Sequence, residues 1–354
     1  MLLRHLDETN PDAFFRYYLM AQQRTRIYTS EIVAIFKTLF MKGVTEASLL
    51  PDRHNYADEE PSAEEDTENA TEAQETSLNG PKFDRIGFTE FLDHLVKSAK
   101  AYGEIVLAKT GDEKIDRHLR NLRMIKSAQT YVFLMYLRVG GCKDAHFRQV
   151  LEITENFVLR RHICRERSNE TESLFAELCN VDPKDPVEKT KEAYRSLCPS
   201  NEQFKSAFAG ADFPASLIER ARYCLEQIEI SRHGKYNELA VLGPDNVHVE
   251  HIIPQKIKTK KAKEEFGDWV EYLGNESEAN HPKYVGRIGN LTLFAGALNI
   301  GASNNPFGKK KAAYKQSSIL MTKELAQRSN FKFSDVNKRS FELADTAVSI
   351  WPIP

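Results

Sequence analysis

Two short motifs bring together the residue types that metal-assisted hydrolysis of a phosphodiester requires. The first is Glu250-His251, and the second contains Asn290, which follows His251 by 39 residues and precedes Asn299 by nine. Such hydrolysis needs a base that activates water and a hard divalent cation that neutralises charge on the phosphate. His251 can be that base, and Glu250 and Asn299 can supply oxygen ligands. The set predicts a nuclease site that holds one metal ion.

The elements that would carry these residues are two strands and a helix or loop. A mostly alternating, β-branched run over 247–253 ends at Pro254, which predicts a strand. Residues 287–294 predict a turn and a second strand. Residues 295–300 predict the start of a helix or a tight loop that carries Asn299.

Neighbouring residues on a strand point to opposite faces, which constrains the site. Glu250 and His251 can reach one cleft only if a bulge or the strand end redirects one of them. His248 shares the face of Glu250, so it is either a third metal ligand or substrate contact, or a polar strand residue without such a role.

This ordered set resembles the HNH, or ββα-metal, nuclease domain at the C-terminus of GmrSD-type modification-dependent restriction endonucleases. The likeness extends from Glu250 to Ser317. The matching positions are Glu250 to Gln255, Gly289 to Leu293, Leu298, Asn299, Asn304 to Phe307, Lys309, Lys310, Tyr314 and Ser317.

The resemblance implies a role for individual residues. His251 would be the general base, and Asn290 would fix the loop and the ring orientation of that base. Glu250 and Asn299 would be metal ligands, with Lys310 near the phosphate. Oxygen and amide ligands suit Mg²⁺ or Mn²⁺. Many HNH sites have Asp where this chain has Glu250, so direct and water-mediated metal contact both stay open.

The resemblance continues upstream of the motifs. Residues 153–164 and 204–229 are similar to the helical region that precedes the nuclease in this family. The N-terminal half of the family is a nucleotide-hydrolysing domain, and its motifs are missing from this sequence. We therefore expect a nucleotide-hydrolysing partner domain or subunit, with this chain as the C-terminal portion of a larger protein or the nuclease half of a split system.

The rest of the chain predicts helices. Apolar residues recur at helical spacing in six segments, which are 14–19, 32–40, 91–107, 131–137, 147–163 and 217–230. Ser30 is placed as the N-cap of the second segment. The expected fold is mainly α, with a multi-helix domain of roughly eight or more helices over 1–235. A small α+β HNH nuclease domain would follow over 236–354.

A tract from Asp52 to Glu75 carries ten acidic residues and one Arg. It cannot bury enough apolar surface to offset its ordering entropy, so it predicts a disordered acidic insert at about 52–80. The alternative is a DNA mimic that competes for a basic surface, although such charge runs are usually only solvated.

Charge is divided unevenly along the chain. From Asn246 to the end, 16 Lys and Arg stand against 11 Asp and Glu, a balance of +5. The total of 49 against 51 leaves 33 against 40, or −7, for the remainder. The basic surplus accompanies the candidate site, so we expect DNA as the partner. The expected contacts are Lys256, Lys309, Lys310 and Lys311, and the alternative is a solvated lysine-rich helix face.

Composition indicates where the protein works. No run of about 18 apolar residues and no signal-peptide core occur in the sequence, so we expect a cytoplasmic protein without membrane insertion. The five cysteines are scattered without a CxxC pair. Their spacing argues against a disulfide framework and against a zinc ribbon.

These features predict a metal-dependent DNA endonuclease that acts in restriction of foreign or modified DNA. One such site cuts one strand, so double-strand cleavage would need a homodimer or successive nicks. Two alternatives stay open. A non-catalytic DNA-binding module is disfavoured because binding alone does not require a base. A regulatory subunit that responds to a partner's nucleotide state is compatible with the missing nucleotide motifs.

Overall fold

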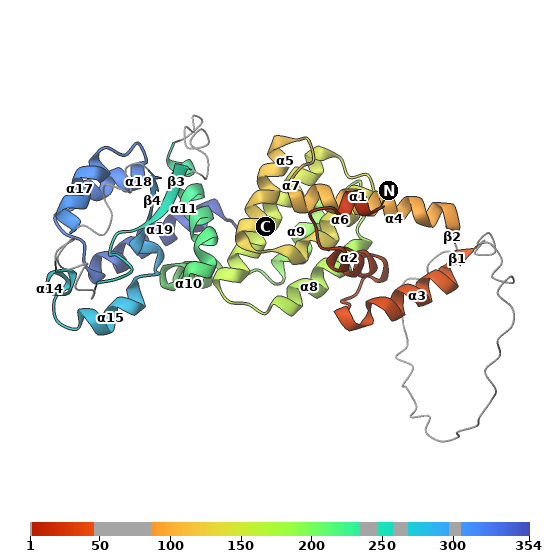
Figure 1. Ribbon diagram of the computed structural model, residues 1–354, viewed down its shortest axis with the longest axis horizontal. Helices are drawn as coiled ribbons and strands as arrows, with labels where there is room; N and C mark the ends of the chain where they lie inside the picture. Colours follow the sequence, from red (N-terminus) through yellow and green to blue (C-terminus); the bar gives the residue numbers. More distant parts are fainter. Residues whose placement is uncertain (1, 46–85, 234–245, 258–267, 297–305) are drawn as a thin grey trace, which may run out of the picture. The chain divides into compact units, whose positions relative to one another are not determined.

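The computed structural model describes residues 2–45, 86–233, 246–257, 268–296 and 306–354. Within these residues the chain is mainly helical, as predicted, and contains one small antiparallel sheet of two strands and one pair of two-residue parallel strands (Figure 1). The predicted acidic insert lies outside the described residues. The same is true of Asn299 and of the lysines between 258 and 263.

The chain forms two compact units. Unit 1 comprises Met1–Asp116, Gln129–Phe147 and Asn169–Pro186, and unit 2 comprises Arg117–Ala128, Arg148–Ser168 and Val187–Pro354. The predicted division at 235/236 therefore falls inside unit 2, and the independence of the part that follows it stays a prediction. Among the described residues, no helix combines the length and apolar character that a membrane span needs.

Unit 1 is built from helices and two very short strands. They are α1 (Leu2–Leu6), α2 (Pro11–Gln23), α3 (Ile32–Gly43), β1 (Val44–Thr45), β2 (Ile86–Gly87), α4 (Phe88–Leu107), α6 (Tyr131–Val139) and most of α8 (Ser168–Glu177). Helices α5 (Glu113–Ile125) and α7 (Asp144–Ile163) begin in unit 1 and continue in unit 2. Helices α2, α4 and α6 meet through aromatic rings. Tyr17 lies 6.1 Å from Tyr102 and 6.4 Å from Tyr131 between ring centroids.

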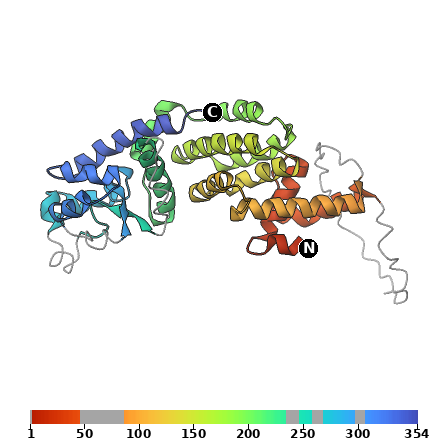
Figure 2. The ribbon, with the colours of Figure 1, turned by 90° about the horizontal axis from the view of Figure 1, so that it is seen from above.

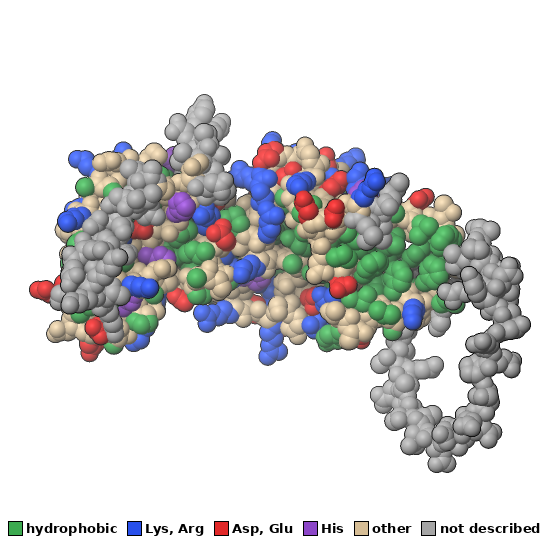
Figure 3. Space-filling view, viewed as in Figure 1, with side chains coloured by type: hydrophobic (Ala, Val, Ile, Leu, Met, Phe, Trp, Pro, Cys, Tyr) green, Lys and Arg blue, Asp and Glu red, His purple; other side chains and the backbone are tan. Residues whose placement is uncertain are grey.

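Helix α3 departs from one sequence expectation. Residues Thr29–Glu31 form a 3₁₀ turn, and Glu31 is the N-cap of α3 without a side-chain cap bond, so the prediction that Ser30 caps this helix is wrong. None of the α3 side chains that the structure describes is buried, and Val33 and Met41 are 66% and 76% exposed. Hydrophobic side chains gather on the viewed face over α3 and α4 (Figure 3).

Unit 2 carries the small sheet and the helices around it. Its elements are α9 (Val187–Arg195), α10 (Asn201–Gly210), α11 (Ile218–Arg232), β3 (Val247–His251), α14 (Trp269–Leu273), α15 (Ser277–Tyr284), β4 (Leu291–Ala295), α17 (Phe307–Lys315), α18 (Leu320–Lys323) and α19 (Phe333–Ile350). Short 3₁₀ turns are η6 (Ala215–Leu217), η7 (Ile288–Asn290) and η8 (Glu324–Gln327). Helices α2, α3, α4, α6, α7 and α11 confirm the six predicted helical segments.

The sheet pairs β3 with β4 in antiparallel register, with His248 opposite Phe294 and Glu250 opposite Thr292. Helix α19 packs against α10, α11 and η7, and α11 also contacts both strands (Figures 1 and 2). Ile252, Ile253 and Phe294 are fully buried in the core beneath the sheet. Both predicted strands are confirmed, although β3 ends at His251, two residues before the predicted end.

A buried polar network supports unit 2 from within. The Glu155 carboxylate accepts from Asn121 at 3.1 Å and from the Tyr223 hydroxyl at 3.0 Å, and it lies 2.5 Å from His118 Nδ1. Trp351 Nε1 donates to the same tyrosine hydroxyl at 2.9 Å. The network therefore joins α5, α7 and α11 to the segment that follows α19.

Candidate functional site

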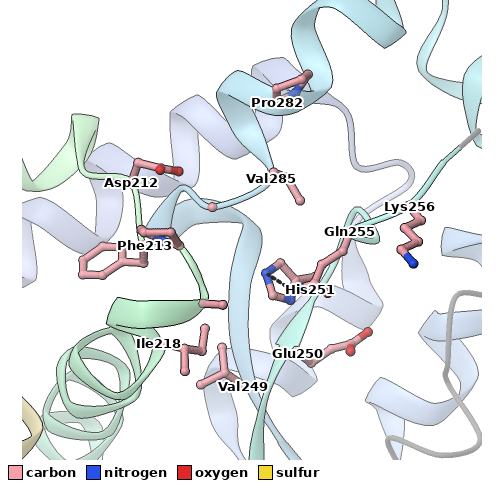
Figure 4. A pocket seen from close by; sticks show the side chains of 13 residues that line it. Asp212, Phe213, Ile218, Val249, Glu250, His251, Gln255, Lys256, Pro282 and Val285 are labelled. Atoms are coloured by element: carbon pink, nitrogen blue, oxygen red, sulfur yellow. Dashed lines mark hydrogen bonds between the residues drawn. The ribbon is translucent and has the colours of Figure 1, made fainter.

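The end of β3 sends two adjacent candidate residues in different directions. Glu250 is buried, and its carboxylate contacts Lys310 on α17. His251 is the last residue of the strand and is half-buried. Its ring projects into a cleft, while Glu250 projects to another side (Figure 4). Alternation along the strand produces this divergence.

Asn290 holds the turn that follows His251. The side chain is fully buried, and its Nδ2 donates to the carbonyls of Ile253 at 2.9 Å and Val285 at 3.0 Å. Its Oδ1 accepts from the Ile253 amide at 2.8 Å, and its carbonyl accepts from the Ile252 amide at 2.9 Å. The Asn290 side chain occupies the Ile253 amide, so backbone pairing with the second strand does not continue to Ile253.

Helix α19 supports the turn that carries this asparagine. Arg339, which is buried, donates to the carbonyls of Gly289 at 2.8 Å and Leu291 at 2.6 Å. The Gly289 amide donates to Ser340 Oγ at 3.1 Å, and a Cβ atom at Gly289 would lie 2.1 Å from the Val336 carbonyl oxygen. Only glycine fits this close approach. Sequence reasoning missed Arg339 and Ser340 because no motif surrounds them.

Lys310 is a basic group of the site that does not lie on the surface. Its side chain is fully buried, and Nζ donates to Glu250 Oε1 at 2.5 Å and to the His251 carbonyl at 2.8 Å. Burial raises the pKa of Glu250 and lowers the pKa of Lys310, and in each case the opposite charge of the partner works against burial. Lys310 is therefore buried, whereas the sequence predicted it on the surface beside Lys309 and Lys311.

The other two lysines of α17 lie nearer to solvent. Lys309 is exposed and Lys311 is half-buried. Consecutive residues of a helix point about 100° apart, which separates three lysines that look equivalent in the sequence. Lys256, which follows the turn after β3, is exposed and lines the cleft.

The environment of His251 keeps its ring neutral. Burial is the main cause that lowers the pKa of His251 to about 4, and the charges of Lys310 and His281 add to it. His281 is buried, and its Nε2 lies 2.8 Å from the Pro254 carbonyl, which gives it a structural contact after the turn. The Gln255 amide nitrogen lies 3.4 Å from His251 Nε2, a long contact that water can replace.

The candidate metal ligands are only partly described. His248 is exposed and lies two residues before Glu250 on the same face of β3. Its ring is close to Gly296, where a Cβ atom would lie 2.9 Å from His248 Nε2. In the part of the chain that the structure describes, no group of three His, Cys, Asp or Glu residues could hold a metal ion. Asn299 lies outside that part.

The cleft in front of His251 has a volume of about 690 Å³. One wall is formed by β3, and another by a short β-bridge between Asp212 and Arg287, beside which the Phe213 amide donates to the Gly286 carbonyl at 2.8 Å. Pro282 and the start of α11 complete the lining. The cleft therefore lies wholly within unit 2.

The fold and the site define a mainly helical protein in which a small antiparallel sheet presents a neutral histidine next to a buried carboxylate. Residues 198–346 match the family model described as GmrSD restriction endonucleases, C-terminal domain. The resemblance inferred from the sequence is thereby confirmed for this stretch, which contains the sheet and most of α19. Residues 153–164 lie outside the match. A comparison with curated proteins gives no match.

Proposed function

We propose that this chain is the nuclease part of a restriction system, an HNH-type, metal-dependent endonuclease that hydrolyses phosphodiester bonds in DNA. Its targets would be foreign or modified DNA in the cytoplasm, in defence against viruses. The observation that carries the proposal is the neutral ring of His251 in an open cleft, inside the stretch that matches a restriction endonuclease family.

His251 acts as the general base in this proposal. A neutral imidazole offers a lone pair that accepts a proton from water, and the lowered pKa keeps it unprotonated at physiological pH. The proton moves from the attacking water to the ring as the water oxygen bonds to phosphorus, and the bond between phosphorus and the departing 3′ oxygen breaks. Asn290 anchors the adjoining turn, so the ring has a defined position.

Two of the three candidate ligands of a hard divalent ion, Glu250 and His248, lie within the described residues. Glu250 supplies a carboxylate and His248 lies on the same strand face, so these two with Asn299 would hold Mg²⁺ or Mn²⁺. Such an ion, when bound, stabilises negative charge on the phosphate and the leaving oxygen. Lys310 keeps one Glu250 oxygen in place through its ammonium group.

Contact with DNA is assigned to the lysines near solvent. Lys256, Lys309 and Lys311 would bind phosphates, which supplies affinity without sequence preference. A homodimer would bring two sites to the two strands, and a partner that hydrolyses nucleotides would control the cut. Both belong to the proposal.

Incubation with supercoiled plasmid tests the proposed activity. The full chain should nick or linearise the plasmid with Mg²⁺ or Mn²⁺, and chelation should stop the reaction. His251→Ala should lower the rate by about 10² to 10⁴, the usual effect of losing a general base. DNA affinity and the thermal unfolding temperature should stay near wild type.

His146→Ala is the matched control, because His146 lies in unit 1 and bonds only to the Lys184 carbonyl at 2.9 Å in the described contacts. It should cut like wild type. Cleavage by His251→Ala at the wild-type rate would overturn the assignment of the base. Metal-independent binding without any cleavage by the wild-type chain would favour the non-catalytic DNA-binding module instead.

A further inference from the structure

The cleft beside His251 has two chemically different parts. Its polar side consists of His251, Gln255 and Lys256, close to Glu250. The remainder is mostly apolar and is lined by Pro214, Ile218, Val249, Pro282 and Val285, while the ring of Phe213 points away from it (Figure 4). The polar side suits phosphate chemistry, whereas the apolar side chains of the other part would strip a phosphate of its hydration.

The apolar part therefore needs another occupant. The whole cleft, polar side included, has a volume of about 690 Å³, which falls within the range of about 300 to 1,000 Å³ that small-molecule sites show. A substrate of the proposed reaction carries a flat, largely apolar group on the sugar next to each phosphate, namely the base. Bases that leave the stack bind between apolar side chains in other enzymes that act on nucleic acid.

Asp212 adds a specific polar group to this part of the cleft. It comes from the bridge with Arg287, on a different wall from His251 (Figure 4). The Asp212 carboxylate lies against Gly286, because a Cβ atom at this glycine would lie 2.2 Å from Asp212 Oδ1. Asp212 is exposed within the lining, and a carboxylate there accepts hydrogen bonds from the exocyclic amino group of cytosine or adenine.

We propose that the apolar part of this cleft is a subsite for an unstacked nucleobase with an exocyclic amino group, next to the phosphate that the water activated by His251 attacks. This inference rests on the proposed nuclease function and names a part of its substrate. The base packs against Ile218 and Val249 while Asp212 accepts from its amino group. The polar side of the cleft then receives the adjoining phosphate.

Fluorescence of 2-aminopurine tests whether a base enters the cleft, because this analogue brightens when it leaves the stack. Full-length His251→Ala protein is mixed with duplexes that carry the analogue at successive positions around the mapped cut. One position should brighten several-fold on binding. Ile218→Trp, combined with His251→Ala, should abolish the signal by filling the cleft, with little change in DNA affinity measured by anisotropy.

No brightening at any position, in a protein whose wild-type form cuts the same DNA, would overturn the subsite and leave the nuclease function standing. Brightening at one position, in a protein whose wild-type form cuts no DNA, would support the base subsite and overturn the nuclease function. A signal that survives Ile218→Trp would show that the base unstacks elsewhere, and it would also overturn the proposal.

Cleavage kinetics test the role of Asp212. Asp212→Ala should slow cutting about tenfold or more when cytosine or adenine occupies the identified position, as expected for a lost bond to a charged group. Cutting should be unchanged with thymine or an abasic site there. The control Glu271→Ala removes an exposed carboxylate on α14 outside the cleft. It should leave the cleavage rate of every substrate unchanged. An equal loss on all four substrates would contradict recognition of the amino group.

Discussion

At the residue scale, the protonation of His251 decides when the proposed base can work. Its pKa is lowered from 6.5 to about 4, mainly by burial, so the ring loses its proton at a lower pH than a free histidine does. We therefore expect the single-turnover cleavage rate to be level from neutral pH down to about pH 5 and to fall through an inflection near 4. An inflection near 6.5 would contradict a desolvated ring.

Circular dichroism over the same pH range is the control for unfolding. The pKa of His162 is also lowered to about 4, chiefly by burial. In the unfolded chain both histidines bind a proton below about pH 6.5, but in the folded chain only near pH 4. Stability contributed by the two neutral rings is therefore complete above pH 6.5 and declines as the pH falls toward 4.

The buried pair of Glu250 and Lys310 gives a second prediction. Removing one partner leaves an uncompensated buried charge, which typically costs about 3 to 5 kcal/mol. Lys310→Met and Glu250→Gln should each destabilise the chain in urea unfolding, and the double variant should cost less than their sum. Strictly additive effects in this double-mutant cycle would contradict a direct interaction.

His251 and Glu250 could be selected from residue types and spacing, because the chemistry of phosphodiester hydrolysis requires a base and an oxygen ligand, whereas the role of Asn290 followed from the family resemblance. The contacts of Lys310 could not be selected in that way. Its burial depends on the rotation of α17 relative to β3, and neither motif encodes that rotation.

At the element scale, we expect the lysines of α17 to have two different roles, contact with DNA for Lys309 and Lys311 and a structural contact for Lys310. Lys309→Ala and Lys311→Ala should each reduce the slope of log affinity against log salt by about 0.9, the value for one lost contact with duplex DNA. Lys310→Ala should leave the slope unchanged and lower stability instead, because its ammonium group contacts Glu250. Binding at several salt concentrations checks this, and a slope change for Lys310→Ala alone would reverse the assignment.

Helix and strand identities followed from apolar periodicity, but the ends of these elements did not. Strand β3 stops early because the side chain of Asn290, which is distant in sequence, accepts from the Ile253 amide. Ser30 failed as a cap because Tyr28 and Glu31 already close a 3₁₀ turn there, with the Tyr28 amide donating to Glu31 at 2.8 Å. Tertiary contacts decided the first end, and a competing local bond decided the second.

At the scale of the whole molecule, the nuclease part needs more chain than the motif region. Arg222 on α11 donates to the Val247 carbonyl at 2.7 Å, and Glu229 accepts from the Leu320 and Met321 amides. A fragment 236–354 lacks both groups, so we expect it to melt without a cooperative transition. A fragment 198–354 restores α10 and α11 and should melt cooperatively by circular dichroism. Equal cooperativity of the two fragments would support the boundary at 235/236.

The division into units could not be derived from the sequence, because unit 2 is assembled from three separate stretches. The buried Glu155 illustrates this. It lies in a helix far upstream of the motifs, and its partners Tyr223 and Asn121 come from two other helices. Composition and periodicity predict helices but do not predict which of them share a core.

The central claim is that His251 transfers a proton in DNA cleavage, and chemical rescue tests it most directly. The full-length variant His251→Gly removes the ring and leaves room for free imidazole in the open cleft. We expect added imidazole to restore plasmid cleavage in a saturable manner, with no effect on wild-type protein. Cleavage by the variant without imidazole at the wild-type rate, or an inactive but folded variant that binds DNA and is not rescued, would contradict this account.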